Sequence, residues 1–231
     1  MKFAASAVVL ALISTTAVSV RPANLAHHAP VALGQTYCTG STPCVTTYHN
    51  DGNRDGVNPN ESVLQASTLG TTAKPAPKWM AVADGQIYTQ PLYVHQLLVN
   101  GAAKNVVYAA TQNNSVYAWD SDSTSASGTT LASVNLNNAS DLGTGYTEIA
   151  VPWSDMPSCG GPVIQPEIGI TGTPVIDVSV TPPVMYLVSR HEDIDGSGNK
   201  TYRQKLHALA ADTLQELPGS PVLLDATFAS N

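Results

Sequence analysis

Two polar runs in this chain have the residue types of calcium-binding loops. Residues 51–56 read Asp-Gly-Asn-Arg-Asp-Gly, which places oxygen ligands at alternate positions and glycine sixth, as in an EF-hand loop. The twelfth position is Ser62, however, and Glu61 falls one residue early. The run 193–199, Asp-Ile-Asp-Gly-Ser-Gly-Asn, lacks a closing glutamate. We interpret both runs as solvated turns and predict no metal ligands, with calcium at 193–199 as the minor alternative.

The chain contains three cysteines, two of them close in sequence. Cys38 and Cys44 flank the turn-rich residues 39–43, so a local disulfide is expected in an oxidising compartment. Cys159, in a Ser-Cys-Gly-Gly-Pro run, is left over as a loop cysteine or as a mispairing partner of the first two. Without C-x-x-C spacing or a neighbouring histidine pair, a metal site is disfavoured. No base is identifiable that would activate Cys159 as a nucleophile.

Carboxylates and histidines elsewhere are the remaining candidates for acid–base chemistry. Asp155 and Glu167 lie near a long insertion, but nothing in the sequence fixes the separation that a glycosidase pair requires. His191 ends a predicted strand, which favours solvent, and His207 alternates with apolar neighbours, which favours a satisfied or surface position. No G-x-S-x-G motif occurs, and no Ser-His-Asp constellation can be placed. The sequence therefore predicts no catalytic residue.

The elements that position these residues belong to a strand-rich segment that occurs twice, near residues 85–136 and 169–224. Three landmarks align between the copies: Pro91 with Pro174, Tyr108 with Tyr186, and Ala118 with Ala208. The strands keep their order while the loops between them change in length. A repeat of short strands is typical of propellers and solenoids, whose units bury their faces only against neighbours.

Each copy is predicted to hold four antiparallel strands, the number in a propeller blade. They span residues 86–94, 105–111, 115–120 and 131–136 in the first copy, and 168–177, 184–189, 202–210 and 216–224 in the second. Asn113-Asn114 and the run 193–199 supply hairpin turns, because Asn, Asp and Gly accept positive φ. Residues 46–49 and 78–83 are expected as strands of an incomplete opening unit, and residues 137–167 as a loop insertion.

Composition and the N-terminus indicate the class of protein and its compartment. Only 12% of the 231 residues are charged, and Gly, Pro, Ser, Thr and Asn are frequent, as in an all-β chain with many turns. The net charge of −7 and the lack of a Lys/Arg cluster argue against nucleic acid. Residues 1–20 have a signal-peptide pattern and residues 21–45 a linker pattern, with a membrane anchor as the alternative. We expect a secreted or periplasmic protein without a membrane span after signal removal.

The run Val-Val-Tyr-Ala-Ala-Thr at 106–111, with Ser-Val-Tyr-Ala-Trp-Asp at 115–120, resembles inner strands of the pyrroloquinoline-quinone-like (PQQ-like, quinoprotein) β-propellers. The opening run 47–56, continued at 61–64, is similar to the N-terminal lead-in of that superfamily. The resemblance spans roughly residues 46–224 and implies a ring of about eight four-stranded blades with ligands on its axis. Residues 46–231 would then be an incomplete propeller, two blades and a lead-in, of a truncated or partial chain.

The resemblance also implies a cofactor site that this chain does not reproduce. Quinoprotein dehydrogenases hold the quinone between a tryptophan and a disulfide of adjacent cysteines, beside calcium and an aspartate base. Here no cysteines are adjacent, Gly128 is followed by Leu131-Ala132 where the docking tryptophan is expected, and Trp119 stands within a strand. We therefore expect an exported binding or scaffold domain without its own catalytic site. Its expected partners are a protein or cell-surface glycan, and the blades or other chains that complete the propeller. The alternative is the N-terminal portion of a PQQ- and calcium-dependent alcohol or sugar dehydrogenase.

Overall fold

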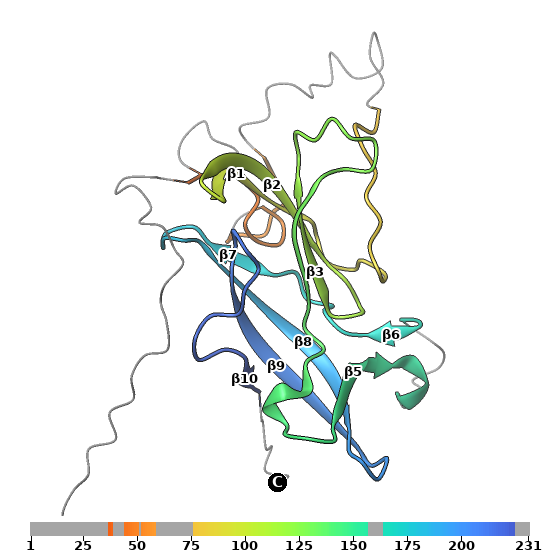
Figure 1. Cartoon of the computed structure of the whole chain (residues 1–231). Helices are drawn as coiled ribbons and strands as arrows, with labels where there is room; N and C mark the ends of the chain where they lie inside the picture. The colour runs from red at the N-terminus through yellow and green to blue at the C-terminus, as the bar shows by residue number, and fades with distance from the viewer. Residues whose placement is uncertain (1–36, 39–43, 51, 59–75, 157–163, 225–231) are drawn as a thin grey trace, which may run out of the picture. The chain divides into compact units, whose positions relative to one another are not determined.

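The computed structural model describes residues 37–38, 44–50, 52–58, 76–156 and 164–224. Within these residues the chain is all-β, with ten strands and two single-turn 3-10 helices (Figure 1). Neither of these helices has the length and hydropathy that a transmembrane span requires. The predicted signal peptide, residues 1–20, lies outside the described residues.

The first sheet is a four-stranded antiparallel meander. It joins, in chain order, β1 (Leu92–Val99), β2 (Ala102–Ala110), β3 (Ser115–Asp120) and β4 (Thr130–Asn135). The predicted turn between β2 and β3 has Asn114 at a φ of 59°, and β1 bends at a bulge between Val94 and Leu97. The four strands predicted for the first copy are confirmed, although β1 begins and ends later than expected.

The second sheet repeats the meander and extends it. Its serial strands are β7 (Val175–Asp177), β8 (Val184–Ile194), β9 (Lys200–Ala210) and β10 (Val222–Leu223). Two further strands are β5 (Thr147–Pro152), which pairs with β8, and β6 (Glu167–Ile168), which pairs with β5. β7 and β5 follow one another along the same edge of β8, against its first and its last residues.

The two meanders have the same register. The aligned positions face one another in both sheets: Leu92, Tyr108 and Ala118 across β1–β3, and Val175, Tyr186 and Ala208 across β7–β9. The hydrogen bond that closes each third strand is repeated as well, from Ser121 N–H to the Asn105 carbonyl and from Ala211 N–H to the Pro183 carbonyl. The repeat inferred from the sequence is therefore also a repeat of backbone pairing.

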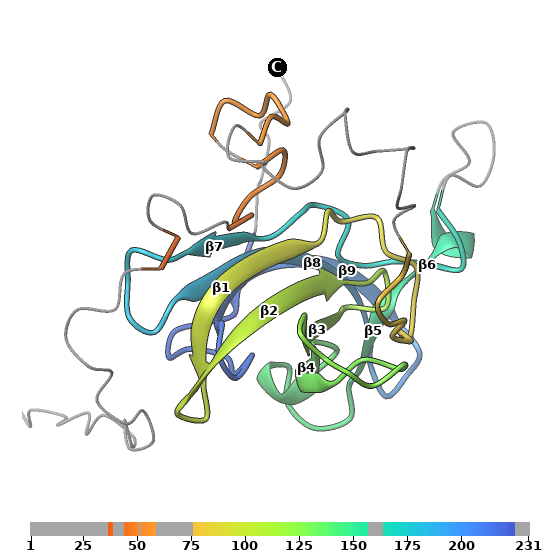
Figure 2. The same ribbon diagram turned by 90° about the horizontal axis from the view of Figure 1, so that it is seen from above.

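The two sheets share one hydrophobic core. Figure 2 shows β1 and β2 lying over β8 and β9. The buried side chains include Leu92, Val94, Val106 and Tyr108 from the first sheet and Ile176, Met185, Leu187 and Leu209 from the second. Along each strand they alternate with residues of the opposite face, as the period of two requires. Removal of this apolar surface from water is the main stabilising contribution.

The start of the described chain is fastened to this core. Tyr37 is buried in it, Val45 forms an isolated bridge to β1, and a disulfide joins Cys38 to Cys44 with their Cα atoms 5.2 Å apart. The linker expected over residues 21–45 is therefore wrong at its C-terminal end, because the Tyr37 ring and the Val45 backbone find partners in the sheet.

Gln112 holds the segment that enters the second sheet. Its Oε1 accepts hydrogen bonds from Gly169 N–H at 2.9 Å and from the Thr171 hydroxyl at 3.1 Å, and its Nε2 donates to the Ile170 carbonyl at 3.1 Å. A Cβ at residue 169 would lie 2.2 Å from the Gln112 carbonyl oxygen, so the approach requires glycine. The buried amide thus fixes the backbone of this junction.

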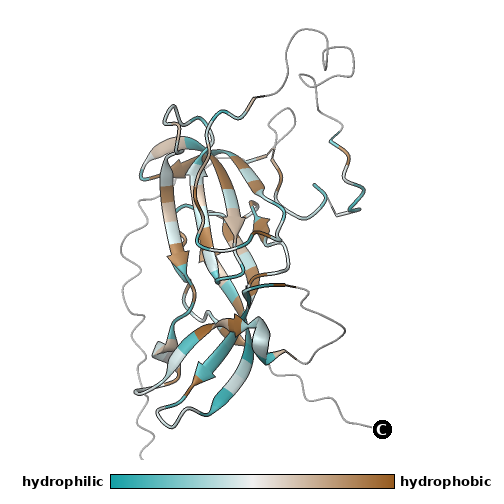
Figure 3. Ribbon diagram, turned by 90° about the vertical axis from the view of Figure 1, so that its right-hand side faces the viewer, coloured by the Kyte–Doolittle hydropathy of each residue, from teal (hydrophilic) through white to brown (hydrophobic). Residues whose placement is uncertain are grey.

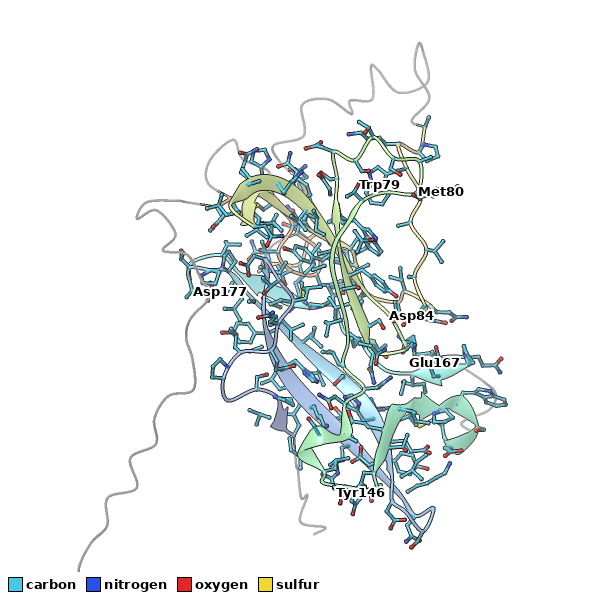
Figure 4. The ribbon with its side chains drawn as sticks, viewed as in Figure 1. Trp79, Met80, Asp84, Tyr146, Glu167 and Asp177 are labelled. Atoms are coloured by element: carbon cyan, nitrogen blue, oxygen red, sulfur yellow. A yellow bond between two sulfur atoms is a disulfide. The ribbon has the colours of Figure 1, made fainter. Side chains whose placement is uncertain are left out.

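Two aromatic side chains make equivalent hydrogen bonds from one unit to the next. The Tyr108 hydroxyl donates to the Ala211 carbonyl at 2.7 Å, and the Trp79 indole N–H donates to the Ser121 carbonyl at 3.2 Å. Ser121 and Ala211 directly follow β3 and β9, the equivalent third strands. Trp79 precedes the first sheet and lies beside the loop after β3 (Figure 4). The carbonyl after each third strand therefore accepts a hydrogen bond from an aromatic side chain outside its own sheet.

The strands predicted for the opening unit are wrong, because residues 46–49 and 78–83 form no strands. Thr46 contributes one carbonyl to an amide of β7, and the Met80 N–H donates to a carbonyl in the β3–β4 loop. A strand needs a neighbour with a free edge. These segments instead meet their neighbours at single backbone hydrogen bonds.

The insertion at 137–167 has more regular structure than predicted. Its described part holds η1 (Ala139–Asp141), β5, η2 (Trp153–Asp155) and β6. β8 runs beyond its predicted end to Ile194, so the edge that β7 leaves uncovered accepts β5. The expectation of a loop is wrong because the pairing edge comes from a distant segment.

We expect Tyr108→Phe to lower the free energy of unfolding by about 1 kcal/mol, because the Ala211 carbonyl would lose its buried donor. Burial raises the pKa of the Tyr108 phenol, so the hydroxyl keeps its proton and remains a donor at neutral pH. Tyr186→Phe, at the aligned but exposed position, is the control and should change stability by less than about 0.5 kcal/mol. Chemical denaturation measures both; equal losses would contradict the assignment.

Gly169→Ala should destabilise the fold by roughly 1–3 kcal/mol, because its Cβ would overlap the Gln112 carbonyl oxygen and the Asn114 side chain. Gly172→Ala is the matched control, since nothing lies within 4 Å of a Cβ built there. Thermal unfolding of the two variants measures the difference. A Gly169→Ala variant as stable as Gly172→Ala would refute the tight junction.

Candidate functional site

The inner face of the second sheet changes from apolar to charged along its two long strands. The apolar end holds Met185 and Leu187 of β8 and Leu209 of β9. The polar end holds Ser189, His191 and Asp193 of β8, with Arg203, Lys205 and His207 of β9. All of these polar residues except Arg203 are buried. Figure 3 shows hydrophilic residues gathered toward one end of the strands.

Ser189 joins two Glu–His pairs. Its Oγ lies 2.5 Å from His191 Nε2 and 2.7 Å from His207 Nε2. On the far side of each ring, His191 Nδ1 lies 2.9 Å from Glu148 Oε1, and His207 Nδ1 lies 3.0 Å from Glu216 Oε2. Glu148 comes from β5 and Glu216 from the segment after β9. We call these five residues the Ser189 network.

The protons of the Ser189 network follow from its hydrogen-bond geometry. Both Nδ1 atoms face carboxylates, so each carries a proton. The Ser189 hydroxyl has a single hydrogen and donates it to one of the two Nε2 atoms at a time. The Glu148 carboxylate faces both His191 and the Lys205 ammonium, and these partners limit the cost of desolvating its charge.

Glu148 is the most constrained carboxylate of this group. Lys205 Nζ lies 2.5 Å from Glu148 Oε2, and Asn138 N–H donates to Glu148 Oε1 at 3.0 Å. Burial by itself raises the pKa of Glu148, but the hydrogen bonds from His191 and Lys205 outweigh burial and hold the pKa at about 2. The insertion thus places a fixed negative charge in the buried half of the network.

Beside the network lies a second ion pair, between the buried Asp193 and the half-buried Arg203. Arg203 Nε is 2.7 Å from Asp193 Oδ2, a contact that is close but not aligned as a hydrogen bond. Burial and the nearby Glu148 charge raise the pKa of Asp193, and Arg203 opposes this shift. The polar end of the sheet therefore contains the Asp193–Arg203 pair in addition to the charges that Glu148, Lys205 and Glu216 contribute.

The Ser189 network opens to the surface at a pocket between the two sheets. The pocket has a volume of about 540 Å³ and is bordered by Lys205, His207 and Glu216. Its other polar lining residues are neutral: Ser133, Asn135, Asn138, Ser140, Thr213, Gln215 and Ser220. His207 and Glu216 are paired with each other, and Lys205 with Glu148. Ser189 has no exposed surface and does not line the pocket, so its hydroxyl is not accessible as a nucleophile.

The carboxylates singled out in the sequence have different neighbours. Asp155, in η2, binds Lys200 and accepts a hydrogen bond from the Tyr202 hydroxyl. Glu167, in β6, lies near Asp84 (Figure 4). Burial and the negative charge of Asp84 raise the pKa of Glu167. Among the described residues, no contact therefore joins Asp155 and Glu167 into a shared acid–base site.

The described residues of the two calcium-like runs make contacts within the protein. In 193–199, Asp195 accepts hydrogen bonds from Ser197 and Asn199 N–H within the hairpin tip, while Asp193 faces Arg203. In the earlier run, Asp55 accepts the Val57 N–H, and Asp51, Glu61 and Ser62 lie outside the described residues, as does Cys159. Across the described part of the chain, no group of three or more metal-ligating side chains occurs.

The quinone and calcium implied by the resemblance do not fit the residues present. The chain has no adjacent cysteines, and its disulfide joins Cys38 to Cys44 beside the edge of β1. Trp119 is buried within β3 and stacks on Tyr117, with 5.1 Å between ring centroids. Neither this disulfide nor Trp119 is therefore available as a platform for a cofactor.

Comparisons of the chain with protein-family models, curated proteins and solved structures give no significant match. Its function must therefore be inferred from its own geometry.

Sequence reasoning missed the principal residues of the site and misplaced one of its candidates. His191 was expected near solvent at a strand end, but β8 continues past it and buries it. Ser189, Glu148, Lys205 and Glu216 were not predicted at all. The alternations Ser-x-His-x-Asp at 189–193 and Arg-x-Lys-x-His at 203–207 are the signal that indicates a polar strand face.

Glu148→Gln should lower the free energy of unfolding at neutral pH by about 3 kcal/mol, because Lys205 and an imidazole would lose a buried counter-charge. Glu216→Gln is the matched control and should cost less, because the Glu216 side chain is 30% exposed.

The pH dependence gives a second readout of Glu148. Its folded pKa of about 2 lies below the ordinary value of 4.5, so its stabilisation is complete above pH 4.5 and disappears as pH falls toward 2. The stability gap between the original chain and Glu148→Gln should close over that window. Denaturation curves measured from pH 7 downward test this; a gap that persists at the lowest pH would contradict it. The comparison cancels the opposite contribution of Glu192, whose pKa is raised by groups other than Glu148. The contribution of Asp193 changes with the substitution, because the Glu148 charge is one cause of its raised pKa.

Proposed function

We propose that this chain is the repeat portion of an exported β-propeller module of PQQ-like architecture that acts as a binding or scaffold domain. The observation that supports the proposal is the common register of the two packed meanders, with the same closing bond after each third strand. Successive four-stranded meanders packed face to face are the arrangement of propeller blades. The two sheets would be consecutive blades, and residues 76–91 part of a lead-in.

A binding role agrees with the chemistry of the pocket between the sheets. Its volume, about 540 Å³, is within the usual range for small-molecule sites. The charged groups at its border are neutralised within the protein, and the remaining polar groups are hydroxyls and amides, which both donate and accept hydrogen bonds. Such a lining suits a neutral polyhydroxylated ligand. We assign it a mono- or disaccharide unit of a glycan.

Titration calorimetry with a panel of neutral mono- and disaccharides tests this assignment. Gln215→Ala should weaken binding about fivefold to tenfold, because one hydrogen bond of the complex is lost. Gln204→Ala, which removes the same amide from the outer face of β9, is the control and should leave affinity unchanged. Equal affinity of both variants, or no saccharide binding, would overturn the ligand class. Dye reduction that depends on added quinone and calcium would overturn the non-catalytic role.

A further inference from the structure

The outer face of the second sheet carries large apolar side chains that nothing in the described chain covers. Tyr186 is 40% exposed, Val188 38% and Tyr202 51%, and Leu223 and Leu224 continue the patch at 46% and 43%. The side chains of Tyr186, Val188 and Tyr202 lie on the face opposite to the core side of β8 and β9. Leu223 and Leu224 border the recess beside them. A recess of about 630 Å³ on this face is lined by Val151, Met156, Arg190, Tyr202, Leu223 and Leu224, with three polar neighbours.

The equivalent face of the first sheet is fully covered. Tyr108, aligned with Tyr186, is 2% exposed, and Ala110, aligned with Val188, has no exposed surface. Their cover is the inner face of the second sheet. The two copies therefore present the same face, occupied in one case and open in the other.

The two aromatic hydrogen bonds indicate which group of a partner would contact the open face. Trp79 donates to the carbonyl after β3, and Tyr108 donates to the carbonyl after β9. Tyr186 is the next member of this series, at the register position of Tyr108. Its exposed hydroxyl is the donor for a carbonyl that follows a third strand in a further unit.

Arg190 extends the same correspondence by one residue. In the first sheet, Gln112 follows the aligned positions and donates to a backbone carbonyl of the segment that enters the next unit. Arg190 stands at that place in the second sheet, on the border of two recesses of the outer face. It offers guanidinium donors where the first sheet uses an amide.

We propose that the outer face of the second sheet docks one further four-stranded unit of this same build, whose carbonyl after its third strand accepts the Tyr186 hydroxyl. A second copy of this chain does not supply that acceptor, because Lys78 and Trp79 occupy the Ser121 carbonyl and Tyr108 occupies the Ala211 carbonyl. The occupant is therefore an additional repeat with a free inner face of aliphatic side chains. This inference rests on the proposed repeat scaffold and names its partner.

The test uses the full chain extended after its last residue by a duplicate of residues 137–224 that carries Tyr186→Phe. The duplicate supplies a second-sheet unit with its own Glu148, and its Phe-containing peptide is distinguished by mass from the peptide of the original Tyr186. In the original chain, N-acetylimidazole should acetylate Tyr186 readily and leave Tyr108 unmodified. In the extended chain, modification of Tyr186 should slow by about tenfold or more, because the docked duplicate shields the ring. Mass spectrometry of peptides locates the modified tyrosines.

Tyr186→Phe provides an independent measurement. This substitution should leave the folding equilibrium constant of the original chain unchanged but lower that of the extended chain about fivefold. Tyr108→Phe should lower that constant in both chains.

Unchanged reactivity of Tyr186 in the extended chain would overturn the docking proposal, as would a duplicate that stays unfolded beside intact original sheets. If either result occurs while Tyr108→Phe still destabilises the original chain, the proposed repeat scaffold remains supported. Loss of the Tyr108→Phe effect in the original chain would remove the scaffold and the docking surface together.

Discussion

Both faces of the first sheet carry buried side chains, so this fold depends on covering a sheet twice. In β3, Val116 and Ala118 belong to the shared core, while Trp119 points to the other side and is also buried. The second sheet covers one face and the segment around Trp79 covers the other. A sheet that buries side chains on both faces is stabilised by neighbours on both sides.

The polar half of the second sheet adds a different constraint. Apolar contacts tolerate small shifts between packed layers, whereas the Ser189 network requires groups from β5, β8, β9 and the following segment to meet within hydrogen-bond distance. Each side chain of the network is the hydrogen-bond partner of another member. A shift in strand register would therefore leave buried charges without partners. The network therefore specifies the position of the insertion relative to the sheet more strictly than hydrophobic contact does.

The local sequence pattern was sufficient to predict the strands of the two meanders. It was insufficient to predict the structure of the segments between them. Alternation along 106–111 and 115–120 predicts strands, and the alignment of Tyr108 with Tyr186 predicts their pairing, because both signals are contained in short segments. β5 was missed because its partner, the last residues of β8, is distant in sequence and longer than expected. Residues 46–49 and 78–83 have strand-like composition but find no free edge. The site was missed because its members come from several segments that only the tertiary fold brings together.

The hydroxyl of Ser189 can orient its single hydrogen toward His191 or toward His207, because both Nε2 atoms lie within hydrogen-bond distance of its Oγ. Rotation about the Cβ–Oγ bond exchanges the two orientations and reverses a buried dipole without breaking a covalent bond. The wall of the pocket is thus electrically polarisable: a dipole placed beside His207 favours one orientation of the hydroxyl over the other. This small domain carries within its interior a dielectric response that a rigid set of salt bridges would lack.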